Sequence, residues 1–70
     1  MTDLSSANAL RLATFRFAEE VFEDKQDAAN WFNTHNHALG GDRPCDHCQT
    51  EEGAQDVRRI LRMIETGGPV

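Results

Sequence analysis

Large apolar residues are few in this sequence, and they recur at steps of three and four. Seventeen of the 70 residues are Leu, Ile, Val, Met, Phe or Trp, and no apolar run is longer than two residues. Steps of three and four follow one face of an α-helix, and no strand-like alternation is found. A chain of this length buries only about 60% of the surface that its unfolded form exposes. The pattern therefore predicts one all-α domain over residues 1–70, a small bundle of three to four helices.

Composition narrows the function that such a bundle can have. A core of this size leaves no room for an enclosed catalytic cavity, so we expect neither an enzyme nor a cofactor. Twelve acidic against seven basic residues give a net charge of −5, which disfavours phosphate-rich ligands and favours a protein partner. The short apolar runs predict neither a membrane span nor a signal peptide. We expect a cytoplasmic protein whose Cys45 and Cys48 are thiols.

Three segments carry the helical period. The first runs from Ser5 to about Phe22 with Ser5 or Ser6 as its N-cap, and the second runs from Asp24 to about Asn33. The third follows a Thr50 cap and ends before Gly67. Its predicted core face consists of Ala54, Val57, Ile60, Leu61 and Ile64.

The first helix carries two adjacent apolar stripes, which predict a central position between neighbours. The first stripe is Leu10, Ala13, Phe17 and Val21, and the second is Leu12, Phe15 and Phe22. On the second helix, small alanines beside a Trp–Phe pair allow close packing. We expect Trp31 to be mostly buried, in one core with Phe17 and Leu61.

Residues 34–44 interrupt the period and contain Gly-Gly and Pro, so they predict a loop. Leu39 is its single large apolar residue and is expected to anchor it. Pro44 suits the first position of a helix, which predicts one helical turn over Pro44–Cys48. Gly53 lies inside the first turn of the last helix, where it costs about 1 kcal/mol relative to Ala. We therefore expect another part of the chain to approach the backbone at Gly53.

Two pairs of possible metal ligands lie close together in the sequence, namely His35 with His37 and Cys45 with Cys48. Four nitrogen and sulfur ligands suffice for a tetrahedral zinc site. The His-x-His spacing is unusual, however, and the histidines precede the cysteines. We therefore expect no metal and interpret the cysteines as small buried residues. A zinc-dependent structural or nucleic-acid module remains the alternative.

The only clustered cations are Arg58, Arg59 and Arg62 on the last helix. Without interleaved aromatic residues they offer no stacking surface for bases, so direct nucleic-acid binding is not expected. Arginine is common among the residues that dominate protein interfaces. The cluster therefore marks a candidate partner surface, although a solvated helix face has the same composition.

Three motifs follow one another along the chain: Ala28-x-x-Trp31-Phe32, Ala38-Leu39-Gly40-Gly41-x-x-Pro44, and Gly53-x-x-x-Val57-x-x-x-Leu61-x-x-Ile64-x-x-Gly67. In this order they resemble the toxin-binding C-terminal domain of the ParS/MbcA/Xre antitoxins. The preceding Val21-Phe22-Glu23-Asp24 is similar to the family's Val-Phe-Gly-Asp corner, with Glu23 in place of the glycine. The chain departs from the family at His35 and His37, where prolines are usual, and at three positions that are usually apolar, Cys45, His47 and Cys48. The sequence gives no role for His47.

The resemblance implies an antitoxin that neutralises a RES-domain toxin, an enzyme that consumes NAD, by covering the toxin's active site with its C-terminal region. In this chain the implied partner-binding residues are Arg58, Arg59, Arg62, Glu65, Gly67, Gly68 and Val70. Seventy residues beginning at Met1 are too few for the DNA-binding helix-turn-helix that family members commonly carry, so operator binding is not expected. A homodimer and a helical adaptor that has lost its toxin are left open.

Overall fold

The computed structural model describes residues 3–67, of which the side chains are described from Ala7 onward. Four α-helices and one 3-10 helix follow in the order α1 (Asp3–Phe22), α2 (Lys25–Phe32), η1 (His37–Leu39), α3 (Pro44–His47) and α4 (Glu51–Glu65). No strand occurs in this range. The predicted all-α class is confirmed, and no helix within the described residues is long and apolar enough to cross a membrane.

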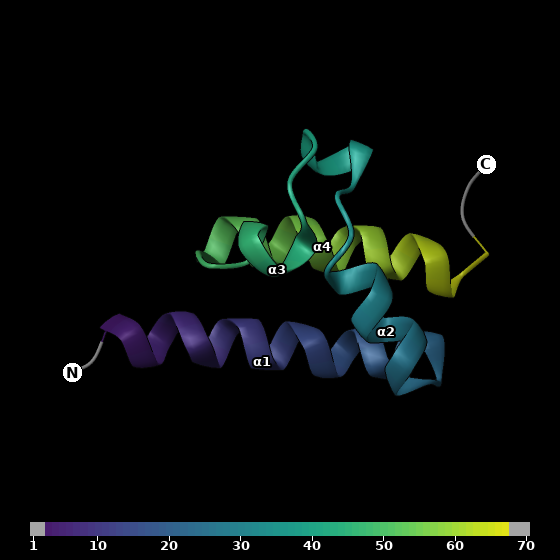
Figure 1. Ribbon diagram of the computed structural model, residues 1–70, viewed down its shortest axis with the longest axis horizontal. Helices are drawn as coiled ribbons and strands as arrows, with labels where there is room; N and C mark the ends of the chain where they lie inside the picture. The colour runs from purple at the N-terminus through teal and green to yellow at the C-terminus, as the bar shows by residue number, and fades with distance from the viewer. Residues whose placement is uncertain (1–2, 68–70) are drawn as a thin grey trace.

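The long helices α1 and α4 lie side by side and run in the same direction, while α2 packs against the C-terminal part of α1 (Figure 1). The segment between α2 and α3 projects from the side of α4 that faces away from α1. Since α1 contacts both α2 and α4, its predicted central position is confirmed.

Two of the helices have the N-terminal side-chain caps that the sequence predicted. The Asp24 carboxylate accepts hydrogen bonds from the amides of Gln26 and Asp27, and the Thr50 hydroxyl accepts one from the amide of Gly53. The start of α1 was predicted wrongly: the helix already includes Asp3, so Ser5 and Ser6 lie inside it rather than at its cap. Leu4 and Ala7, on either side of the serines, are good helix formers and allow the helix to extend past them.

The core lies between α1, α2 and α4 and is built largely from small residues. Its buried members are Ala18, Ala28, Phe32, Leu39, Cys48, Ala54, Val57 and Leu61. Alanine on three different helices lets the helix axes approach closely. Thr14 is also fully buried, and its hydroxyl is satisfied because it donates to the carbonyl of Leu10 at 2.7 Å.

The two rings of the Trp–Phe pair are buried to different extents. Phe32 is the buried member and meets the ring of Phe15 edge-on at 5.2 Å. Trp31 is only partly buried and packs at the border of the core against Phe22, at 5.8 Å between ring centroids. Leu61 is fully buried as predicted, and Phe17 packs against the core from a partly exposed position.

The segment after α2 is more ordered than the predicted loop. It contains η1, which begins where the Asn36 side chain accepts from the amide of Ala38 and ends at Gly40, whose φ is 71°. The ends of the segment are joined by a hydrogen bond from the Asn36 amide to the Asp42 carbonyl, at 2.9 Å. Leu39 is buried, so its predicted role as the anchor is confirmed.

Gly53 is required by the contact between α3 and α4. A Cβ atom at this position would overlap the carbonyl oxygen of His47. The expected close approach of another backbone is therefore confirmed, and it brings the short helix α3 directly against the first turn of α4.

Candidate partner-binding surface

The three arginines of α4 surround a hollow on the outer side of the helix. Together with Gln55 they line a depression of about 360 Å³. The positions 55, 58, 59 and 62 are separated by steps of three and four, so they lie along one face of the helix. This arrangement confirms that the sequence cluster is also a cluster in space. Its role in partner binding stays a prediction.

The hollow carries an excess of positive charge. Arg59 lies 3.4 Å from the carboxylate of Asp56, and neither Arg58 nor Arg62 takes part in any ion pair found among residues 3–67. A planar guanidinium presents five donors and pairs best with a carboxylate or phosphate. The surface therefore has the chemistry to receive an acidic group.

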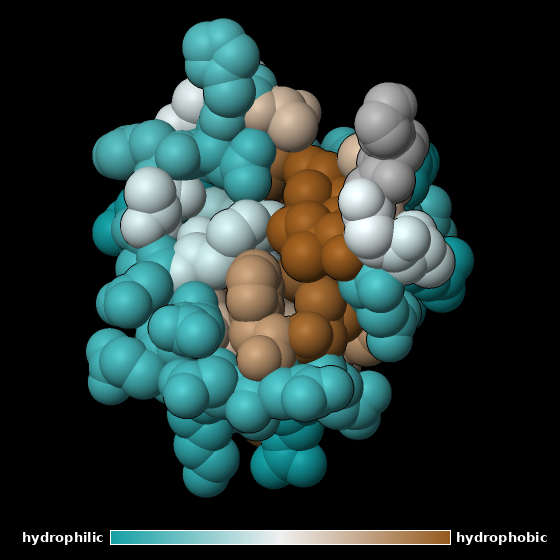
Figure 2. Space-filling model, turned by 90° about the vertical axis from the view of Figure 1, so that its right-hand side faces the viewer, coloured by the Kyte–Doolittle hydropathy of each residue, from teal (hydrophilic) through white to brown (hydrophobic). Residues whose placement is uncertain are grey.

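Beside the hollow, the last turn of α4 carries exposed apolar side chains, which the sequence pattern did not predict. Met63 is 42% exposed and Ile64 is 39% exposed. Figure 2 shows a hydrophobic stripe running across this end of the molecule, between the ends of α4 and α1. Ile64 was expected in the core, and this expectation is wrong. The buried row of α4 ends at Leu61, one turn earlier, and Ile64 lies near the end of the helix with less of the chain to cover it.

Helix α4 ends before Gly67, as the sequence predicted. Glu65 is the last residue of the helix and is exposed. The amide of Gly67 donates to the carbonyl of Ile64, and its φ of 92° turns the backbone away from the helix. The predicted contact residues Gly68 and Val70 lie outside the described residues.

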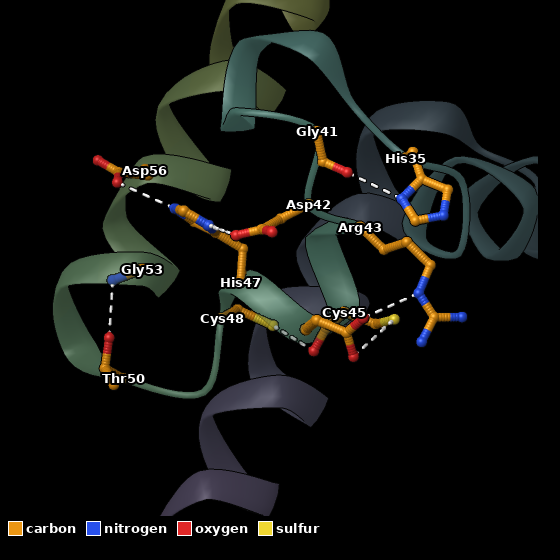
Figure 3. Close-up of polar contacts among 11 residues, drawn as sticks. His35, Gly41, Asp42, Arg43, Cys45, His47, Cys48, Thr50, Gly53 and Asp56 are labelled. Carbon is orange, nitrogen blue, oxygen red and sulfur yellow. Dashed lines mark hydrogen bonds and ion pairs between the residues drawn. The ribbon is translucent and has the colours of Figure 1, made fainter.

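His47 joins the segment around η1 to α4. Its Nδ1 lies 3.0 Å from the carboxylate of Asp42 and its Nε2 lies 3.2 Å from that of Asp56 (Figure 3). These two hydrogen bonds raise the pKa of His47, because each carboxylate favours the protonated ring. The histidine thus has a structural role that spacing alone could not reveal, since Asp42 and Asp56 lie five and nine residues away on either side.

An ion pair between Arg43 and Asp46 lies at the start of α3. The Arg43 Nε donates to Asp46 at 2.9 Å, and this hydrogen bond lowers the pKa of Asp46. Both side chains are largely solvated, so the pair contributes little to stability.

The alternative zinc site is not formed by the described residues. His35 donates from Nδ1 to the carbonyl of Gly41, and the Cys48 thiol is buried and donates to the carbonyl of Cys45 (Figure 3). Across residues 3–67 no group of three or more His, Cys, Asp or Glu side chains is placed to hold a metal ion. Burial also raises the pKa of Cys48, which opposes the thiolate that zinc requires. The four candidate ligands are therefore not gathered into a metal site, and the expectation that the domain folds without metal stays a prediction.

Comparison with known protein families finds a match over most of the described chain. The model of the antitoxin Xre/MbcA/ParS C-terminal toxin-binding domain covers residues 17–67. The match begins at Phe17, in the last third of α1, and includes α2, η1, α3 and all of α4. No curated protein and no solved structure matches the chain.

Proposed function

This chain belongs to the Xre/MbcA/ParS antitoxin family and contains its C-terminal toxin-binding domain, and we propose that it neutralises a RES-domain toxin. In this proposal α4 and the residues that follow cover the toxin's active site. The contact residues in this proposal are Arg58, Arg59, Arg62, Glu65, Gly67, Gly68 and Val70. The chain acts by binding and not by catalysis. Because its target consumes NAD, neutralisation would take place in the cytoplasm.

The observation that carries the proposal is the arginine-lined hollow on the outer side of α4. It lies within the region that the family match covers, and two of its three guanidinium groups have no carboxylate partner among the described residues. A protein with a net charge of −5 would gain from placing these cations against its own acids. Their accumulation on one exposed face instead supports a partner that supplies the carboxylates.

The second support is the direction of the chain at Gly67. A left-handed residue directly after α4 redirects the backbone, so the residues that follow need not continue the line of the helix. In this proposal α4 covers the rim of the toxin's cleft, and the residues after Gly67 enter it.

The test is co-purification and growth rescue with a RES-domain toxin, and the first candidate to clone is any such toxin found in the neighbouring open reading frame. We expect deletion of residues 67–70, or the double variant Arg58→Glu/Arg62→Glu, to abolish toxin binding and rescue while helical circular dichroism is retained. The matched control is Arg16→Glu/Lys25→Glu, which makes the same change in charge at two exposed residues away from α4. Equal rescue by the α4 variants and the wild type would place the interface elsewhere, for example on residues 34–42.

A further inference from the structure

Large apolar side chains are exposed at two places within the described part of the molecule. Leu12 is 53% exposed on α1, and Met63 and Ile64 are 42% and 39% exposed on the last turn of α4. Single exposed apolar residues are common on soluble proteins and need no explanation. The pair on α4 differs because its two residues are adjacent and because Figure 2 shows a continuous hydrophobic stripe at this end of the molecule.

The exposed pair borders the arginine hollow. At about 100° per residue, positions 60 and 64 lie on one flank of α4 and positions 58 and 62 on the other, with position 63 on the solvent side between them. Ile60 is partly buried and extends the apolar flank toward the core. The outer surface of α4 thus changes from basic to apolar across the width of one helix. Interfaces commonly combine an apolar centre with a charged rim.

We infer that Met63 and Ile64 form the apolar anchor of the toxin interface. The inference rests on the proposed function and extends it, because it specifies the surface that the toxin must offer. That surface carries one or two large apolar side chains that pack on Met63 and Ile64, with Asp or Glu beside them facing Arg58 and Arg62. Methionine suits such a position, since its flexible side chain adapts to the shape of a partner.

The charges of the chain favour the toxin over a second copy as the occupant. A two-fold dimer places the same patch of both copies face to face. Such a dimer would join two chains of net charge −5. A toxin that places Asp or Glu beside its apolar side chains instead supplies carboxylates for Arg58 and Arg62.

The experiment compares Met63→Ser/Ile64→Ser with Leu12→Ser in the full chain. Leu12 is at least as exposed as the pair but lies before residue 17, outside the toxin-binding match, so Leu12→Ser is the matched control. Affinity for the purified RES-domain toxin is measured by calorimetry, and folding is measured by circular dichroism. We expect the double variant to bind at least about 30-fold more weakly, which is the effect of losing one interface hot spot. Leu12→Ser should bind like the wild type.

Each other outcome overturns a defined part of the argument. If the double variant binds normally while Arg58→Glu/Arg62→Glu does not, the apolar anchor is wrong and the proposed function stands. If both bind normally, α4 is not the interface. If only Leu12→Ser weakens binding, the toxin docks on α1 instead. If light scattering finds a dimer that Met63→Ser/Ile64→Ser dissociates, the apolar pair is a self-association surface and not the toxin anchor. The single variants Met63→Ser and Ile64→Ser carry the test if the double variant loses helicity.

Discussion

Replacing Glu23 with glycine should stabilise the domain, because Glu23 is the only residue other than glycine with a positive φ in the described range. It follows α1 directly, has a φ of 58°, and donates its amide to the carbonyl of Glu19 at 2.8 Å. This is the left-handed position that ends many helices and that glycine usually fills. The family's Val-Phe-Gly-Asp corner has glycine there, so this chain keeps the turn with a less suitable residue.

The size of the gain follows from three contributions. A residue with a Cβ atom loses about 1–2 kcal/mol in the left-handed conformation. Replacing this residue with glycine relieves that strain but costs about 0.5–1 kcal/mol, because glycine loses more conformational entropy on folding. The carboxylate of Glu23 also lies next to the negative end of the α1 dipole, which is unfavourable by about 0.3–1 kcal/mol. Together they predict that Glu23→Gly raises the free energy of unfolding by about 1 kcal/mol.

Thermal and urea unfolding followed by circular dichroism measure this gain. For a domain of this size, about 1 kcal/mol corresponds to a rise in Tm of about 4–8 °C. Glu23→Ala separates the causes, because it removes the charge and keeps a Cβ atom at the strained position. It should recover only a few tenths of a kcal/mol. An equal gain from Ala and Gly would show that charge and not backbone strain is responsible. A loss of stability in Glu23→Gly would refute the reasoning altogether.

Three further predictions concern His47, Gly53 and metal. Because the pKa of His47 is raised in the fold, its bonds to Asp42 and Asp56 stabilise the fold fully below the unfolded-state pKa of about 6.5, and this stabilisation is lost as the pH rises through the folded-state pKa. His47→Gln should therefore flatten the dependence of Tm on pH in this window. An unchanged slope would contradict the role assigned to His47. Gly53→Ala should destabilise the fold by about 3 kcal/mol in urea unfolding, because the added Cβ overlaps the His47 carbonyl; a gain of about 1 kcal/mol, as helix propensity alone predicts, would mean that α3 does not press on α4. Treatment with a chelator should leave the helical circular dichroism and the Tm unchanged, and a collapse of helicity would reinstate a metal site.

Several features could be predicted from the sequence because they depend on neighbours along the chain. Asp24 and Thr50 cap their helices through side-chain bonds that reach only two or three residues. The left-handed conformation of Gly67 follows from its position just after the last helix. The burial of Leu39 follows because it is the single large apolar residue of the loop. The family could also be recognised, because its motifs are short, ordered and spread over the same range that the family match covers.

Other features were decided only by tertiary structure. Leu12 and Ile64 both continue apolar stripes with helical spacing, yet both are exposed because no other described element covers them. His47 lies at a position the family fills with an apolar residue, and its role depends on two carboxylates that the fold brings to its two nitrogens. Periodicity tells which side chains share a face of a helix. How far a neighbouring helix extends along that face determines which of them are buried, and in this protein that difference creates the apolar surface at the end of α4.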